Sequence, residues 1–346
     1  MLNRVTFISA AVLGALLFAG CSKTAGPVAK RGPAIGFRAG SALLLDDAQT
    51  RASIIEGTQF GNGDVFTVFG TRNSGDSHTV IFDGVDVRNE GSSWTYANPR
   101  FWWWENSSDY YDFVAVYPAG KGTARMDING NLAVSTPYDI ASDNYDILGA
   151  TFRRRGNVAD RTSTVEMGFS HMASAVRVVI LNNSDLTSVR IDSIEYKNLV
   201  VCGDAKVTLD LYGATSLSWI NTERNTSKVR KTVIPAADGN VAHGARYTAE
   251  YDLMIPERLD QSAAAGNNEA DMPRLFIHYT PQGGVSSTAN ILLKDVKRQD
   301  NTSITSWEPG VKYNYYVSMR LDGGVLVSIV TTAWDEVEAE TPGLLI

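Results

Sequence analysis

The fold is decided by residues 206–213, KVTLDLYG, in which apolar and polar side chains alternate along an extended run. A second run, VRIDSIEY at residues 189–196, alternates in the same way. Successive side chains of a strand point to opposite faces of a sheet, so a period of two buries one face and leaves the other in water. This pattern is typical of antiparallel sandwiches.

Similar runs of β-branched and aromatic residues occur along the whole chain and end near glycine, proline or asparagine. They lie at residues 64–70, 79–88, 111–118, 175–181, 247–255, 274–279, 291–296, 313–321 and 325–331. Within residues 79–88, the dipeptide Asp83-Gly84 predicts the turn of a hairpin. No stretch has a convincing helical period, so we expect an all-β chain built from short strands in sandwiches.

The first twenty residues have the composition of an export signal. Arg4 precedes an apolar run, Val5 to Gly20, that is too short to cross a bilayer as a helix. The run ends in LFAGC, which resembles a bacterial lipobox, so we expect cleavage before Cys21 and lipid attachment to its thiol. The alternative is that Cys21 is an ordinary cysteine in a signal that is cut elsewhere.

Length and charge narrow the class of protein. The chain has 346 residues, which suggests two domains, and a formal net charge of −7 argues against a nucleic-acid partner. Residues 153–163, RRRGNVADRTS, are polar and lack periodicity, which predicts a domain boundary in this region. We expect the basic cluster Arg153-Arg154-Arg155 to lie in a solvated loop or at a protease-sensitive site.

Motifs for catalysis or metal binding are missing from the sequence. The four histidines lack metal-site spacing, and Cys21 and Cys202 are the only cysteines. There is no nucleophile elbow, P-loop or complete dinucleotide fingerprint. We therefore expect no catalytic residues, metal or cofactor and no enzymatic activity, and we expect His171 to be a hydrogen-bonded core residue.

The most unusual feature is the aromatic run Trp102-Trp103-Trp104. Strand alternation puts Trp103 on one face and Trp102 and Trp104 on the other. In one interpretation, one face fills a core and the other packs under a loop. In the second, the run forms an exposed platform on which a sugar stacks, because large exposed apolar patches usually indicate a partner.

An ordered series of motifs resembles the fimbrillin family, the lipoprotein subunits of type V pili in Gram-negative anaerobes. The motifs are the lipobox at Cys21, TRA at 50–52, GDVFTVFG at 63–70, WTY at 94–96, RFW at 100–102, FVAVYP at 113–118, FSHMASAV at 169–176 and WEPGVKYNY at 307–315. Each motif alone is weak, but their order and spacing together are fairly specific. The resemblance covers most of the chain after residue 20.

This resemblance implies two tandem transthyretin-like antiparallel β-sandwich domains. On this chain, we expect an N-terminal sandwich at residues 53–162 and a C-terminal sandwich at residues 163–346. They follow a signal peptide at 1–20 and a lipidated tether with a removable N-terminal strand at 21–52. The implied location is the cell outer membrane, through lipid on Cys21, and the cell-surface pilus.

The resemblance also implies that an arginine-specific protease cuts the N-terminal region, with Arg51 as the first choice and Arg38 as the runner-up. Loss of the first strand would leave unpaired backbone groups and an apolar slot, which a strand from a neighbouring pilin subunit fills. The donor would be residues 325–331 with the short tail after Trp334, or the protein is a tip or accessory subunit. The alternative function is a surface glycan-binding lipoprotein with a host or dietary ligand at Trp102, Trp103 and Trp104.

Overall fold

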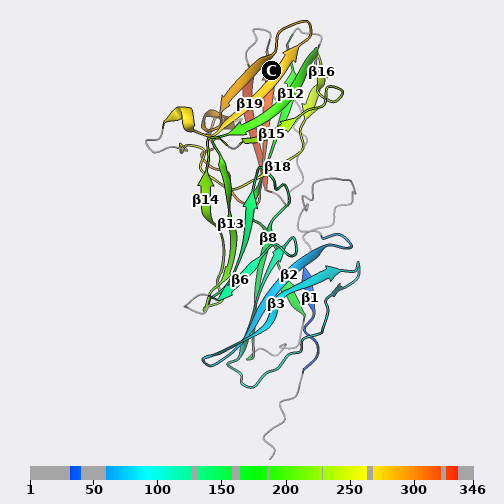
Figure 1. Cartoon of the computed structure of the whole chain (residues 1–346), viewed down its shortest axis with the longest axis vertical. Helices are drawn as coiled ribbons and strands as arrows, with labels where there is room; N and C mark the ends of the chain where they lie inside the picture. The colour runs from blue at the N-terminus through cyan, green and yellow to red at the C-terminus, as the bar shows by residue number, and fades with distance from the viewer. Residues whose placement is uncertain are drawn as a thin grey trace, which may run out of the picture.

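The structure is a computed structural model that describes residues 32–39, 60–126, 131–157, 164–184, 188–227, 229–262, 268–298, 300–320 and 325–333 (Figure 1). Strands dominate these residues, and the expected all-β sandwich class is confirmed. The helices described are the short 3-10 turns η2 (Glu269–Asp271) and η3 (Leu293–Asp295). Within the described ranges, no helix is long and apolar enough to span a membrane.

The N-terminal sheet has the strand order β10-β8-β5-β2-β3-β4, and its neighbouring strands are antiparallel. Its strands are β2 (Val65–Ser74), β3 (Ser77–Asn89), β4 (Trp94–Thr95), β5 (Tyr110–Tyr117), β8 (Leu148–Arg155) and β10 (Ser170–His171). Arg153-Arg154-Arg155 ends β8 and pairs with β5, so the expectation that this cluster lies in a loop is wrong.

The predicted hairpin at Asp83-Gly84 is also wrong, because β3 continues through this dipeptide. The partner of Val68 is Val85 and the partner of Gly70 is Phe82, so two residues of β3 face one residue of β2. This arrangement is a β-bulge, and the positive φ of Gly84 (66°) is a conformation that glycine adopts without strain. The dipeptide bends a strand instead of reversing the chain.

The linking sheet has the order β14-β13-β7-β6. Its strands are β6 (Thr123–Met126), β7 (Leu132–Asp139), β13 (Val200–Leu209) and β14 (Thr215–Arg224). Burial alternates strictly along β13, as the pattern that begins at residue 206 predicts, but the strand ends at Leu209. The predicted continuation to residue 213 is wrong, because the chain turns at residues 210–214, where the Asp210 side chain accepts from the Ala214 amide. The sheet combines strands from both sides of the predicted boundary, and the division at residues 162 and 163 stays a prediction.

Two further sheets pack on each other as the C-terminal sandwich. One contains β11 (Ser174–Asn182), β17 (Arg246–Thr248), β18 (Asp252–Met254), β21 (Lys297–Arg298), β22 (Val311–Met319) and β23 (Val325–Ala333). The other contains β12 (Ser188–Lys197), β15 (Val229–Val233), β16 (Asn240–Ala242), β19 (Arg274–Pro281) and β20 (Ser287–Leu292). β11 pairs with β22, and β21 with β23, in parallel orientation.

The molecule is elongated, with the N-terminal sheet at the lower end, the C-terminal sandwich at the upper end and the linking sheet between them (Figure 1). Both faces of the N-terminal sheet pack against a hydrophobic core, although much of β3 is exposed. Val114 and Val116 face the linking sheet, in a core that continues into the C-terminal sandwich. Phe66 and Phe113 belong to a second core on the other face, which is rich in aromatic side chains.

Candidate functional site

The second core is closed by the leading segment, residues 32–39, which contains β1 (Phe37–Ala39). β1 runs parallel to β9 (Val165–Met167), and the Val165 amide donates to the Gly36 carbonyl at 2.9 Å. The opposite edge of the segment pairs with residues 100–102 through bonds from the amides of Gly32 (2.9 Å), Trp102 (3.1 Å) and Ile35 (2.8 Å). The leading segment is therefore bonded along both edges.

Side chains of the leading segment enter the aromatic core at alternate positions. Ile35 and Phe37 are buried, whereas the Arg38 side chain between Phe37 and Ala39 points to solvent. The Phe37 ring lies edge-on to four other rings, at centroid distances of 6.4 Å to Phe66, 5.3 Å to Phe82, 5.7 Å to Tyr96 and 5.8 Å to Phe113. Burial of each of the two apolar side chains contributes roughly 1.5–3 kcal/mol.

Tyr96 and Arg100 fix the position of the segment. The Tyr96 hydroxyl donates to the Ile35 carbonyl at 2.7 Å and accepts from the Arg100 amide at 3.2 Å. The Arg100 guanidinium donates from Nε to the Ile81 carbonyl at 3.1 Å. Burial raises the pKa of Tyr96, so its phenol stays protonated and remains a donor at neutral pH.

If the leading segment were removed, the same place would be an open slot beside the aromatic core. Its floor would be the rings around Phe37, and its two edges would be residues 100–102 and β9. The Arg100 and Trp102 carbonyls and the Val165 amide would lose their backbone partners. Unpaired backbone groups beside an apolar slot are the features that a complementing strand satisfies.

Of the two predicted processing sites, Arg38 is the one that lies among the described residues. Arg38 lies inside β1 with a side chain that is 73% exposed, and its Nη1 is 3.9 Å from the Glu166 carboxylate. An ion pair this exposed contributes little to stability. Arg51 lies outside the described residues, as does the predicted lipidation site Cys21.

The tryptophan run is divided between a core and the surface, as alternation predicts. Trp102 is completely buried and Trp104 is half-buried, and their rings stack at 5.6 Å with 14° between their planes. Trp103 is 48% exposed, with the Arg72 guanidinium 5.7 Å from its ring centroid. Of the three predicted stacking residues, Trp103 therefore has the largest exposed fraction.

The loop that carries Trp103 is held at both ends. The Tyr111 hydroxyl accepts from the Trp103 amide and donates to the Trp103 carbonyl, both at 2.8 Å. Asp109 accepts from the amides of Glu105 (2.8 Å) and Asn106 (3.1 Å) and from Arg72 (3.1 Å). Burial acts to raise the pKa of Asp109, but these hydrogen bonds outweigh it and lower the pKa to about 2.

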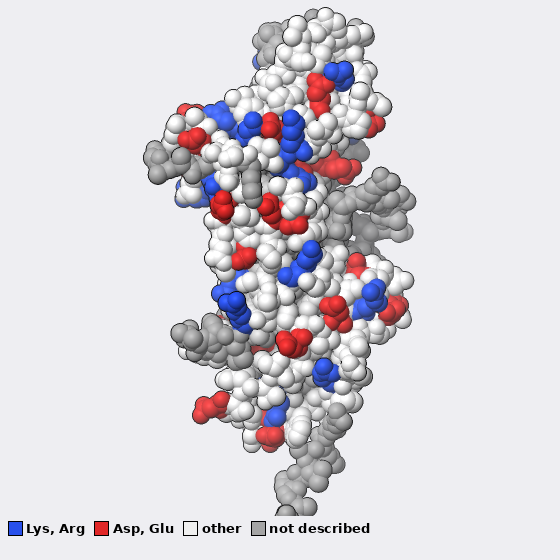
Figure 2. Space-filling view, in the orientation of Figure 1, with Lys and Arg blue, Asp and Glu red and all other residues white. Residues whose placement is uncertain are grey.

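His171 is a core residue, as predicted. Its Nδ1 lies 2.8 Å from Oδ2 of Asp146, and both side chains are buried. Among the described residues, no group of three His, Cys, Asp or Glu side chains is placed to hold a metal ion. Figure 2 shows acidic and basic side chains interspersed over one face of the molecule.

A family model described as fimbrillin-like matches residues 50–334, which is most of the chain. The chain belongs to the fimbrillin-like family. Membership supports a fimbrial or adhesive subunit at the cell surface, in a family of adhesion and fimbrial proteins and not of enzymes. A search of curated proteins found no match to this fimbrillin-like chain.

Several solved structures are similar to the fimbrillin-like chain. A candidate cell adhesion protein from Bacteroides uniformis is 14% identical, with 87% of this chain and 99% of that chain covered and a TM-score of 0.49. One from Bacteroides ovatus is 15% identical, with 90% and 100% covered and a TM-score of 0.49. The tip fimbrial protein Mfa3 from Porphyromonas gingivalis is 11% identical, with 79% and 95% covered and a TM-score of 0.39.

The sequence predicts part of the arrangement around the leading segment of this fimbrillin-like protein. The resemblance predicts an N-terminal strand within residues 21–52, and β1 lies in this range at Phe37–Ala39. The pairing of β1 with β9 is not predicted, although the alternating apolar residues at 165, 167 and 169 are a usable signal for a short strand. The role of Tyr96 as an anchor for the Ile35 carbonyl is visible only in three dimensions, because the two residues are 61 positions apart.

Proposed function

We propose that this chain is a structural or adhesive subunit of a type V pilus, exported as a lipoprotein through Cys21 and assembled by strand complementation. In this proposal, an arginine-specific protease cuts at Arg51 and the leading segment leaves its groove. A strand from a neighbouring subunit then occupies the groove. The observation that carries the proposal is the leading segment itself, which fills an aromatic core near the start of the chain and is bonded along both edges.

The position of Arg51 supports it as the cut. Arg51 follows the leading segment and precedes Phe60, whose ring packs against Phe66 and Phe169 in the body of the sandwich. Cleavage there would separate the whole leading segment from the body and leave the core strands intact. Arg38 is less suited, because its backbone must first detach from β9 before a protease can bind it as an extended substrate.

The first experiment treats the purified protein with an arginine-specific protease. We expect the trimmed protein to form oligomers that resist mild denaturant. Arg51→Lys is the matched control, because it keeps the charge but removes the cleavage site, and it should stay monomeric. Arg38→Lys should behave like the wild type. If correctly trimmed protein stays monomeric under every condition, assembly by strand complementation is wrong.

A peptide experiment tests the groove separately from assembly. A synthetic peptide with the sequence of residues 32–39 should bind the trimmed protein and block its oligomerisation. The same peptide with Phe37→Ala should not bind, because it loses the ring contacts to Phe66, Phe82, Tyr96 and Phe113. Equal binding of both peptides would contradict a groove that selects an aromatic side chain.

The lipid anchor has its own test. Cells grown with labelled palmitate should incorporate label into the wild-type protein and not into Cys21→Ser. If Cys21→Ser is still labelled, the lipid is attached to another residue and the proposed anchor at Cys21 is wrong. Partition of the two proteins between membrane and soluble fractions provides a second measurement of the same prediction.

A second candidate function is glycan binding at Trp103, which is favoured by its half-exposed ring on a loop held by Tyr111 and Asp109. On a glycan array, Trp103→Ala should abolish the signal of the wild-type protein, and Trp103→Phe should retain part of it because a stacking face remains. If the wild-type protein binds no glycan on the array, the candidate function of glycan binding at Trp103 is wrong. Trp104→Ala is less informative, because Trp104 stacks on the buried Trp102 and its loss disturbs the core.

A further inference from the structure

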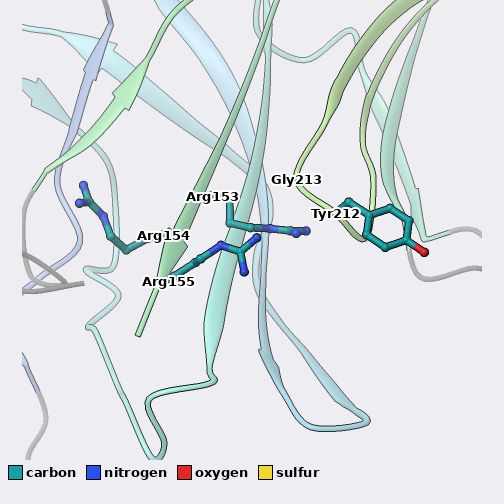
Figure 3. Close-up of a pocket in the computed structure, with 5 residues that line it drawn as sticks. All are labelled: Arg153, Arg154, Arg155, Tyr212 and Gly213. Carbon is teal, nitrogen blue, oxygen red and sulfur yellow. The ribbon is translucent and has the colours of Figure 1, made fainter. Parts of the chain in front are cut away.

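A cavity of about 240 Å³ lies between the end of β8 and the turn that joins β13 to β14. Its lining residues are Arg153, Arg154, Arg155, Tyr212 and Gly213. Figure 3 shows the Arg153 side chain reaching toward Gly213, with Arg155 beside it and Arg154 pointing to the other side. Strand alternation explains this division, because residues 153 and 155 share one face of β8.

The turn at residues 210–214 is fixed by hydrogen bonds and does not depend on Tyr212 for packing. Oδ1 of Asp210 accepts from the amides of Tyr212 (2.9 Å) and Ala214 (2.7 Å). Arg153 donates to the carbonyls of Leu211 (2.6 Å) and Asp210 (2.8 Å). The turn therefore presents the Tyr212 side chain, which is 86% exposed, from a rigid backbone.

The two arginines on this face have different roles. Arg153 is compensated by Asp112, with Nε and Nη2 at 2.6 Å and 2.8 Å from its carboxylate oxygens, and its guanidinium stacks on Tyr110 at 4.5 Å. Arg155 is exposed, and its charge also acts on the Asp112 carboxylate, which is bonded to Arg153. On this face of the cavity, the two guanidinium groups of Arg153 and Arg155 share the single carboxylate of Asp112, so one positive charge is left in excess on a chain whose net charge is −7.

We propose that this cavity binds an anionic sugar residue, with the negative group on Arg155 and the sugar ring against Tyr212. A guanidinium recognises a carboxylate or a sulfate through paired N–H donors. An aromatic side chain that is exposed on a fixed turn offers a flat face to the C–H groups of a sugar ring. The cavity volume suits a single ring, since sites for larger ligands usually exceed about 300 Å³.

An acidic peptide is the competing occupant, and the shape of the site disfavours it. A stable protein interface buries about 1,200–2,000 Å² in total, whereas this site is a small hollow between one strand end and one turn. The binding does not depend on strand complementation or on Trp103. The purified, untrimmed monomer is therefore the material for the test, and failure here leaves the proposed assembly untouched.

The test is a titration of the protein with simple sugars, followed by ligand-observed NMR. The probes are methyl glucuronoside and galactose 6-sulfate, with methyl glucoside and galactose as their neutral counterparts. We expect binding of at least one anionic sugar, no binding of its neutral counterpart and weaker binding as NaCl rises from about 50 to about 500 mM. The two anionic probes distinguish a carboxylate site from a sulfate site.

Variants connect the binding to the cavity. Arg155→Gln should weaken binding at least about tenfold, because it removes a charge-assisted hydrogen bond. Tyr212→Ala should weaken it by about threefold or more through loss of the stacking face. The matched control is Arg246→Gln, which makes the same charge change at an exposed position of β17 in the C-terminal sandwich.

Four results with the sugars would overturn the proposal, and a fifth comes from a competing peptide. The four are no binding of either anionic sugar, equal binding of neutral and anionic sugars, unchanged affinity in Arg155→Gln, or loss of affinity in Arg246→Gln to the same extent. A hexaglutamate peptide serves as the last comparison. If it binds more tightly than the sugars and depends on Arg155, the site belongs to a protein partner and the sugar proposal is wrong.

Discussion

Glu257 is a buried carboxyl group in the C-terminal half of the molecule, beside the guanidinium of Arg224. Its Oε1 accepts from the Val200 amide at 3.0 Å, and its Oε2 lies 2.6 Å from Nη2 of Arg224. Burial raises the pKa of Glu257 to about 7, and the pairing with Arg224 opposes this increase only in part. The folded protein therefore holds a proton on Glu257 that an exposed glutamate, with its ordinary pKa of 4.5, releases in weak acid.

This proton makes stability depend on pH in a defined direction. Between about pH 4.5 and 7, the folded state binds more protons at Glu257 than the unfolded state does, so the free energy of unfolding falls as pH rises. The contribution is fully present below pH 4.5 and is lost as pH rises through 7. We expect Glu257→Gln to remove this slope, because glutamine does not titrate and still accepts from Val200.

Urea unfolding of the wild type and Glu257→Gln at several pH values between about 5 and 8 measures the effect. The difference between the two proteins isolates Glu257, since every other titratable group is common to both. One unit of pKa difference corresponds to about 1.4 kcal/mol. Parallel stability curves for the two proteins would show that the pKa of Glu257 does not change on folding.

β1 is the element on which the proposed assembly depends, and its attachment is measurable in the uncut protein. Phe37→Ala removes the ring that touches Phe66, Phe82, Tyr96 and Phe113. Replacing a buried phenylalanine by alanine typically costs about 3–5 kcal/mol, and we expect a loss near the lower end because β1 can detach locally. The measurement is the free energy of unfolding in urea.

Arg38→Ala is the control for this prediction, since Arg38 belongs to the same strand and points to solvent. A surface change of this kind should alter stability by no more than about 0.5 kcal/mol. Equal effects of the two substitutions would mean that the leading segment does not pack on the aromatic core.

Individual strands also show which structural features the sequence predicts and which it does not. Alternation correctly predicts β13 as far as Leu209, with side chains buried at every second position, and it places Trp103 opposite Trp102 and Trp104. The turn signal at Asp83-Gly84 is misleading, because the same dipeptide serves a hairpin turn and a bulge, and only the partner strand decides between them. Parallel pairing of β1 with β9 joins Phe37 to Val165, and no local pattern encodes a contact between segments so distant in the chain.

The basic cluster at residues 153–155 is a second place where the sequence pattern is misleading. Three consecutive arginines predict a solvated loop, yet the Arg153 side chain is almost buried because Asp112 of β5 and the carbonyls at 210 and 211 satisfy its donors. Those partners come from separate parts of the chain. The charges of this cavity are visible in the sequence, but their pairing depends on how the N-terminal and linking sheets meet.

At the scale of the whole molecule, one continuous core joins the two ends. Gly149 of β8 lies where the N-terminal sheet meets the linking sheet, and a Cβ there would be 2.5 Å from Cγ2 of Val207 and 3.1 Å from Sδ of Met172. We expect Gly149→Ala to destabilise the protein by about 1–3 kcal/mol through overpacking. Calorimetry should show one unfolding transition, shifted as a whole to lower temperature.

Gly168→Ala is the matched control, because an added Cβ at this position meets no atom within 4 Å. Its unfolding temperature should stay close to that of the wild type. Two separate transitions, with Gly149→Ala moving only one of them, would instead support two sandwiches that unfold independently at the predicted boundary.

The ladder between β7 and β13 has a mechanical consequence for a surface fibre. It pairs residues 132–139 with residues 202–209 without interruption, in a sheet that runs along the long axis between the two ends of the molecule (Figure 1). Tension applied to those ends loads this ladder in shear, so many of its hydrogen bonds must rupture together and cannot unzip one after another. In the proposed filament, each subunit would therefore resist the drag of flowing liquid through its middle as well as through its joints.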